Sequence, residues 1–179
     1  ALYQMENASI ALAVCAVLKD SGVKLDDRLT KEAVSKTHWA GRMELVKDNL
    51  YVDGAHNPQG IRSFVDSVDS LYESEKLSDA TLLFSVVSDK NYDQMIKILC
   101  ECKHFKCVYV TMTGGVRRLS SEIIKQAFEA HLPGISIEIF DSVDGAVHEW
   151  DNGLMFATGS LYLVGDVVRA LERKENNHD

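Results

Sequence analysis

The chain has 179 residues, 46% hydrophobic and 26% charged, which is the usage of an ordinary globular protein rather than of a disordered one. Its net charge is −8, and its basic residues form no cluster larger than a pair such as Arg117-Arg118, so nucleic acid and anionic membranes are not expected as main partners. No apolar run approaches the roughly 20 residues that span a bilayer. At this length one main domain with an adequate core is the default expectation.

The predicted elements begin with a helix over Met5–Leu18, where apolar residues recur at steps of three and four. Asp20-Ser21-Gly22 ends this helix, and a polar connector with one short helix follows over 24–36. Two short strands, 43–46 and 50–53, then flank a turn-prone segment. The sequence starts at Ala1, inside a helical pattern and without the charged region of a signal peptide, which favours a piece of a longer protein.

From residue 50 onward, strands and helices alternate. Asn57-Pro58 supplies an N-cap and a first-turn proline for the next helix, and Thr81–Val87 reads as a strand buried on both faces. The remaining elements are helix 92–102, strand 106–111, helix 120–131, strand 135–140, helix 143–150, strand 154–157, helix 160–173 and a polar tail over 172–179 that should fray. This alternation predicts an α/β fold with a mostly parallel sheet of about six strands flanked by helices.

The four cysteines, at positions 15, 100, 102 and 107, form no CxxC pair and are expected to be reduced thiols of a cytoplasmic protein. Cys100, Cys102, His104 and Cys107 lie close in sequence, but they lack the two paired halves of a structural zinc site. We therefore expect no metal ligands in this chain.

Three loops follow predicted strands, where ligands of parallel sheets bind. The first, Asp53-Gly54-Ala55-His56-Asn57-Pro58, joins a carboxylate, an imidazole and an amide at a helix N-terminus, which suits hydroxyls and phosphate. A polar turn that Asp53 merely caps is equally consistent with this spacing. Thr158-Gly159-Ser160 suits close backbone approach to a ligand, although a capped helix is the simpler interpretation. Thr113–Arg118 carries two guanidinium groups that bind phosphate or carboxylate, or are only solvated.

Four stretches together resemble the C-terminal part of folylpolyglutamate synthase and of the related dihydrofolate synthase. They are Tyr3–Ala8, similar to HQxxNA with Tyr3 in place of His; Trp39–Glu44, similar to WxGRME; Asp53–Pro58, similar to DGAHNP; and Phe156–Tyr162, similar to FxTGSLY. The wider superfamily is the Mur ligases, so the resemblance implies a Rossmann-like fold of the Mur ligase C-terminal domain type. It also implies that residues 1–20 are the last helix of a central ATP-binding domain, 21–38 a connector and 39–179 the C-terminal ligase domain.

Such enzymes form an amide bond between L-glutamate and a folate or dihydropteroate through an acyl phosphate made from ATP. The resemblance implies that ATP and Mg²⁺ are bound mainly by N-terminal and central domains, and this chain has no P-loop motif. We therefore expect the chain to be inactive alone, to close over the nucleotide and to work with the missing P-loop domain of the same polypeptide. Two alternatives stay open: the C-terminal domain of a cell-wall Mur ligase, which the GRME and TGSLY residues disfavour, and a noncatalytic Rossmann-like binding module.

The resemblance also assigns roles to individual residues. It implies ATP phosphate contacts for Asn7 and Arg42, and a ribose contact for Asp53. His56 would lie at the nucleotide and the incoming glutamate, where it is the candidate catalytic residue. Ser160 and Arg118 are candidates for holding glutamate or another carboxylate.

Overall fold

The computed structural model describes residues 2–113 and 117–176, and the chain divides into two compact units, Ala1–Ala40 and Gly41–Asp179. Within the described ranges, no helix is both long enough and apolar enough to cross a membrane.

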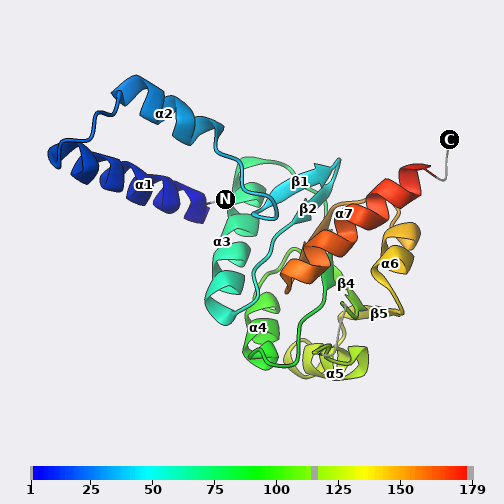
Figure 1. Cartoon of the computed structure of the whole chain (residues 1–179). Helices are drawn as coiled ribbons and strands as arrows, with labels where there is room; N and C mark the ends of the chain where they lie inside the picture. Colours follow the sequence, from blue (N-terminus) through cyan, green and yellow to red (C-terminus); the bar gives the residue numbers. More distant parts are fainter. Residues whose placement is uncertain (1, 114–116, 177–179) are drawn as a thin grey trace. The chain divides into compact units, whose positions relative to one another are not determined.

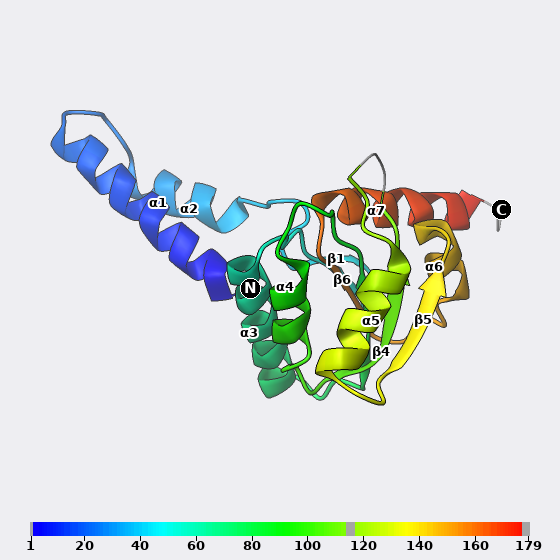
Figure 2. The same ribbon diagram turned by 90° about the horizontal axis from the view of Figure 1, so that it is seen from below.

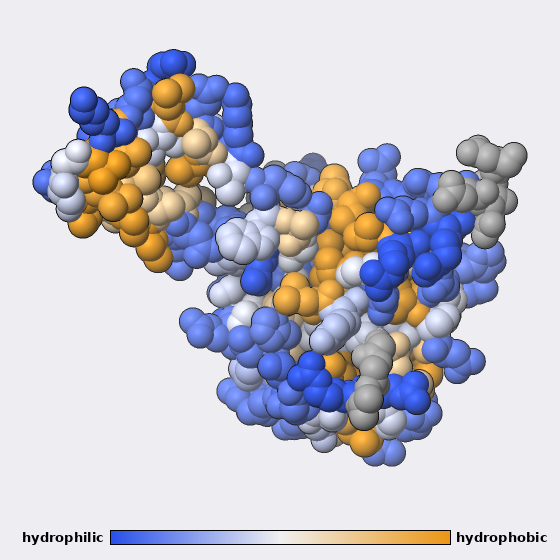
Figure 3. Space-filling model, in the orientation of Figure 1, coloured by the Kyte–Doolittle hydropathy of each residue, from blue (hydrophilic) through white to orange (hydrophobic). Residues whose placement is uncertain are grey.

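The first unit consists of α1 (Leu2–Asp20) and α2 (Asp27–Lys36), which confirms the predicted helix and the short helix of the connector. Gly22, with a φ of +93°, follows the end of α1, as the sequence predicted. The helix α1 carries apolar residues around its whole circumference, and several are exposed (Figure 3); these are Met5, Ile10, Val14 and Val17. Helices that are apolar on all sides are normally buried in a larger protein.

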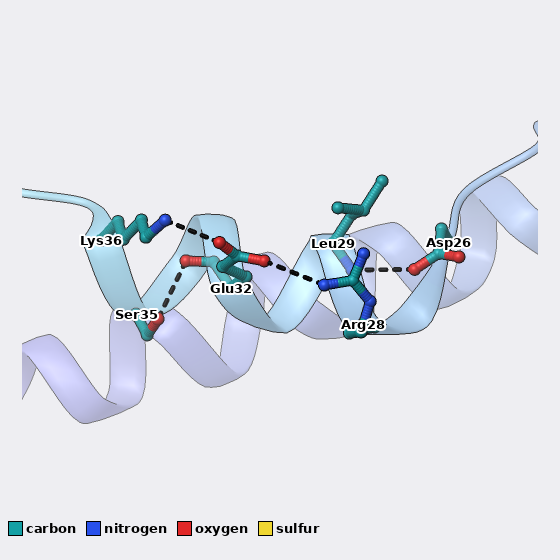
Figure 4. A network of polar contacts seen from close by, with 6 residues as sticks. All are labelled: Asp26, Arg28, Leu29, Glu32, Ser35 and Lys36. Carbon is teal, nitrogen blue, oxygen red and sulfur yellow. Dashed lines mark hydrogen bonds and ion pairs between the residues drawn. The ribbon is translucent and has the colours of Figure 1, made fainter.

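The helix α2 is held by local contacts rather than by a core, since none of its residues is buried (Figure 4). The Asp26 carboxylate accepts a hydrogen bond from the backbone N–H of Leu29 at 2.8 Å and so caps the first turn. Glu32 forms i,i+4 ion pairs with Arg28 at 3.5 Å and Lys36 at 2.6 Å. Exposed pairs of this kind contribute only about 0.3–0.5 kcal/mol each.

The second unit is built on a six-stranded sheet with the order β1-β2-β6-β3-β4-β5. Its strands are β1 (Glu44–Lys47), β2 (Leu50–Val52), β3 (Ala80–Phe84), β4 (Phe105–Thr111), β5 (Ser136–Phe140) and β6 (Met155–Thr158). Among these described strands, only β1 and β2 pair in antiparallel fashion, through a turn at Asn49 with a φ of +66°, and the other neighbours are parallel. The predicted α/β class and mostly parallel sheet are therefore confirmed.

Helices cover both faces of this sheet, giving three layers (Figures 1 and 2). They are α3 (Pro58–Ser74), α4 (Tyr92–Leu99), α5 (Ser121–His131), α6 (Val143–Glu149) and α7 (Leu161–Asn176). One core cluster joins α3, α4 and α5 to the sheet around Phe64, Phe84 and Phe156, and the other joins α6 and α7 to the opposite face around Leu83. This burial on both faces explains why the central strands read as continuous apolar runs.

Several element ends differ from the sequence prediction by one to three residues; the helix predicted over 92–102, for example, ends at Leu99. The strand β3 ends at Phe84 rather than at Val87; the N–H of Ser85 still donates to the carbonyl of Thr158 at 3.4 Å, and its hydroxyl bonds to Thr113. The tail predicted to fray from residue 172 is helical as far as 176, since Arg173 donates to both carboxylate oxygens of Asp144 at 2.7 and 2.9 Å. Residues 177–179 lie outside the described part of the chain.

Candidate functional site

Three of the sequence motifs meet at the carboxyl edge of the sheet. The backbone N–H of Gly54 donates to the carbonyl of Gly41 at 2.7 Å, and that of Gly159 donates to the carbonyl of Ala55 at 3.0 Å. These bonds join the turn before β1, the loop after β2 and the loop after β6. Because β2 and β6 are parallel neighbours, their following loops are side by side, where a ligand of an open α/β sheet binds.

Asp53 is the buried link within this edge, since the residue is only 1% exposed. Its Oδ2 accepts a hydrogen bond from the backbone N–H of Met43 at 2.9 Å, and its Oδ1 accepts one from Ala55 at 2.8 Å. Met43 has a φ of +49° and Gly41 a φ of +70°, so the carboxylate stabilises an unusual turn. The geometry therefore gives Asp53 a structural function, which was one of the two interpretations of the spacing.

Arg42 lies in this turn, between the two residues that bond to the loop after β2. Its side chain is partly exposed, and the backbone on both sides is fixed by the Gly41–Gly54 and Met43–Asp53 contacts. The Gly41 N–H also donates to Glu44 Oε2 at 2.6 Å. A guanidinium on a fixed backbone loses less conformational freedom when it binds an anion.

His56 is half-buried, and its Nδ1 lies 2.8 Å from the carbonyl oxygen of Gly54. A carbonyl oxygen only accepts, so Nδ1 carries the proton of the neutral ring. Nε2 is then the nitrogen that accepts a proton or a hydrogen bond from a ligand. This arrangement suits a ligand contact or a proton acceptor.

The two helices that begin at this edge are capped by side chains of the motifs. Asn57 Oδ1 accepts from the N–H of Gly60 at 2.8 Å at the start of α3, which confirms the predicted N-cap. Ser160 is buried, and its Oγ accepts from the N–H of Tyr162 at 3.1 Å at the start of α7. Capping thus accounts for the contacts of Ser160 in this structure, and its contact with glutamate stays a prediction.

Gly159 has to be a glycine. Its φ is +110°, and a Cβ at this position would lie 2.4 Å from the carbonyl oxygen of Ser85. The backbone of the loop after β6 therefore packs directly on the end of β3. This close approach fixes Ser160 relative to both neighbouring strands.

The third predicted loop, Thr113–Arg118, is described only in part, because 114–116 lie outside the described residues. Arg118 is exposed and its backbone pairs with Val87. Sequence reasoning singled out Arg118 but not its neighbour Arg117, which makes the side-chain contacts. The Arg117 guanidinium donates to Asp89 at 3.1 Å and to the Tyr162 hydroxyl at 3.2 Å, and the bond to Tyr162 and the charge of Asp89 raise the pKa of Arg117 above its ordinary value.

Sequence reasoning named the loops at Thr113 and Thr158 but did not predict that hydroxyl groups are buried at these strand ends. Ser85 Oγ accepts from the N–H of Thr113 at 3.0 Å and lies 3.1 Å from its hydroxyl. Thr158, at the end of β6, is fully buried, and its hydroxyl has no hydrogen-bond partner among the described residues. Polar residues following an apolar strand were the available signal, but the same pattern marks many ordinary loops.

Asn7, the remaining predicted ATP contact, belongs to the first unit. It is exposed on α1, and its side chain donates to Gln4 at 3.0 Å. Its role at the nucleotide stays a prediction. In the part of the chain that the structure describes, no three His, Cys, Asp or Glu side chains gather in an arrangement that could hold a metal ion.

The residues that form this edge belong to a segment that matches a known protein family. The model of the "Mur ligase, glutamate ligase domain" matches residues 41–164. The chain is 27% identical over 178 residues to dihydrofolate synthase/folylpolyglutamate synthase of Bacillus subtilis, and 26% identical over 172 residues to folylpolyglutamate synthase of Lacticaseibacillus casei. These matches cover 95% and 94% of this chain but only 39% and 38% of the relatives, so the chain spans about two fifths of their length.

Solved structures agree on the fold. A folylpolyglutamate synthase from Thermotoga maritima matches with a TM-score of 0.77 and 25% identity, covering 97% of this chain and 39% of that one. The E. coli FolC protein in complex with ADP matches with a TM-score of 0.76 and 18% identity, covering 93% and 39%. The fold is that of the Mur ligase C-terminal domain, and the chain belongs to the Mur ligase family through its glutamate ligase domain.

Proposed function

We propose that this chain is the C-terminal part of an ATP-dependent ligase that joins L-glutamate to a folate or dihydropteroate. One observation carries the proposal: the GRM turn, the DGAHNP loop and the TGS turn are distant in sequence but joined by backbone hydrogen bonds at one edge of the sheet. This edge is where the ligands of open α/β sheets bind. The family membership supports the ligase class, and the relatives' names point to the folate branch.

The proposed organisation follows from α1 and from the length of the relatives. Residues 1–20 would be the last helix of a central domain whose remainder covers the exposed apolar side chains of α1. Residues 21–38 would form a connector and 39–179 the C-terminal ligase domain. The P-loop and the Mg²⁺ ligands would come from the rest of the polypeptide, and the chain alone would be inactive.

In the proposed reaction, a substrate carboxylate oxygen attacks the γ-phosphorus of ATP and releases ADP. The glutamate amine then attacks the carbonyl carbon of the acyl phosphate, loses a proton and releases phosphate. Arg42 would bind the phosphates from its fixed turn, together with Asn7 from α1. His56 would face the nucleotide and glutamate with Nε2, which accepts either a hydrogen bond or the amine proton.

Three further contacts belong to the proposal. Ser160 and Arg118 would hold a carboxylate of glutamate. Asp53 would accept from the ribose hydroxyls, which requires the Gly41–Met43 turn to open, because the carboxylate is buried and bonded to the backbone of this turn. All four cysteines are free, in keeping with a reducing compartment such as the cytoplasm.

The test measures ADP release by the full-length polypeptide with ATP, Mg²⁺ and L-glutamate, offering dihydropteroate, a reduced folate or a muramyl precursor in turn. We expect turnover with a pterin substrate; turnover only on the muramyl compound would assign the cell-wall branch, and none on any would favour a noncatalytic module. Arg42→Ala should lower kcat/KM for ATP about 10- to 100-fold, since a hydrogen bond to a charged group contributes about 1.5–3 kcal/mol. Arg28→Ala, on exposed α2, is the matched control that should leave turnover unchanged.

A further inference from the structure

A second polar cluster lies at the same edge of the sheet, outside the four sequence motifs except for one residue. It consists of Asp89 in the loop after β3, Arg117 in the loop before α5, and Tyr162 in the first turn of α7. We name these three residues the Arg117 cluster. It connects the loops that follow β3 and β4 to the helix that follows β6.

The guanidinium of Arg117 spans two partners at once. Nη1 donates to Asp89 Oδ2 at 3.1 Å, and Nη2 donates to the Tyr162 hydroxyl oxygen at 3.2 Å. The planar guanidinium reaches its two partners with two separate nitrogens, a geometry that a single ammonium nitrogen does not reproduce. As all three side chains are substantially exposed, the ion pair adds little to the free energy of unfolding, and its effect is on orientation.

Bonds to the loop after β3 hold the backbone of Arg117 and Arg118 in place. The N–H of Ser88 donates to the carbonyl of Arg117 at 2.7 Å, and Val87 pairs with Arg118 in an isolated antiparallel bridge. Deeper in the same pair of loops, Ser85 bonds to Thr113. Because the backbone is held, Arg117 has fewer conformations to lose when it binds Tyr162.

The contact determines what the Tyr162 hydroxyl can do. A phenol oxygen that accepts from Arg117 keeps its own O–H to donate to another group. Tyr162 is half exposed, and its backbone N–H bonds to Ser160 in the first turn of α7. The phenol O–H is therefore a donor carried by the start of this helix. A charged guanidinium on the phenol oxygen also polarises the O–H, which strengthens its bond to an anion.

We propose that Arg117 is a positioning residue that holds the Tyr162 hydroxyl as a donor to an anionic oxygen of a ligase substrate. The inference rests on the proposed function and deepens it. The anionic oxygen is a carboxylate if it belongs to the amino acid and a phosphate oxygen if it belongs to the nucleotide. Arg117 acts through Tyr162 and makes no substrate contact of its own in this scheme.

The experiment is a double-mutant cycle in the full-length polypeptide, with kcat and the KM of L-glutamate and of ATP measured separately. Arg117→Ala and Tyr162→Phe should each raise one KM about 10-fold, and the double variant should be no worse than Tyr162→Phe. The KM that rises distinguishes carboxylate from phosphate. Arg117→Lys should behave like Arg117→Ala, whereas Arg169→Ala, which removes another exposed ion pair on α7, should leave both KM values unchanged.

Two results would overturn the proposal: a silent Tyr162→Phe, or multiplicative effects of the two substitutions. If the wild-type polypeptide shows no ligase turnover, the proposed function fails. The positioning of Tyr162 by Arg117 can still be tested on the 179-residue chain by nuclear magnetic resonance of the arginine side-chain nitrogens. The guanidinium protons of Arg117 should then exchange with water more slowly than those of Arg118, and Tyr162→Phe should reduce the difference, leaving the part that the Asp89 ion pair supplies. Equal exchange rates in the wild-type chain would refute the positioning.

Discussion

Gly159→Ala tests the close approach of the loop after β6 to the end of β3. The substitution forces an L-residue to a φ of +110°, which costs about 1–2 kcal/mol. It also places a Cβ 2.4 Å from the Ser85 carbonyl oxygen and 2.6 Å from the Phe84 ring, where both neighbours are buried. Overpacking of this kind costs about 1–3 kcal/mol, so the free energy of unfolding should fall by about 2–5 kcal/mol in total. For a domain of this size, that corresponds to a Tm lower by about 4–20 °C.

The assay is unfolding in guanidinium chloride, followed by far-ultraviolet circular dichroism. Gly134→Ala is the matched control, because Gly134 also has a positive φ, +90°, but a Cβ added there would meet no atom of the described residues within 4 Å. It should show the backbone cost alone, about 1–2 kcal/mol. If the two variants lose the same free energy, the packing of Gly159 on Ser85 does not hold the site together, and the reasoning is refuted.

Two other predictions concern a cap and a pair of thiols. Asn57→Ala should lower the free energy of unfolding by about 1 kcal/mol, because it removes the acceptor of the Gly60 N–H at the start of α3. Asn57→Asp keeps an acceptor and should have the wild-type free energy of unfolding. An Asn57→Ala variant as stable as the wild type would contradict the cap. Burial raises the pKa of Cys100 and of Cys102 from 9.0 to about 11. The unfolded chain releases these protons first, so their stabilisation is complete below pH 9 and is lost as the pH rises through about 11. Slow alkylation of both thiols by iodoacetamide at a pH of about 8 checks that the thiols are buried and protonated in the folded chain, and rapid alkylation would count against their raised pKa values.

The regular elements of the second unit were predictable because their signals are local. Asn57 and Ser120 both cap the helices expected after them, and the alternation of apolar runs with amphipathic segments predicted the parallel sheet. The ends were less predictable. The strand β3 ends at Phe84, where Ser85 bonds through its hydroxyl to Thr113, a residue 28 positions away, and no local pattern contains that contact.

The candidate site was predicted as a set of motifs and not as a set of contacts. His56, Asn57 and Ser160 lie at the expected loops, but Asp53 is buried in backbone hydrogen bonds, which the residue type alone does not distinguish from an exposed ligand group. Of the adjacent pair Arg117-Arg118, only geometry identifies Arg117 as the residue that bonds to Asp89 and Tyr162. Two neighbouring arginines are equivalent in a sequence until the backbone fixes their directions.

The sequence by itself determined the α/β class, the helix starts and the segments that carry polar chemistry, because capping, periodicity and turn preferences depend on residues a few positions apart. The tertiary structure decided that Gly41, Gly54, Ala55 and Gly159 meet through backbone hydrogen bonds, and that Gly159 has no room for a side chain. Those contacts depend on the order of strands in the sheet, which places β6 between β2 and β3 although it comes last in the chain. Strand order is set by the burial of both faces of the whole sheet, a property that no single segment encodes.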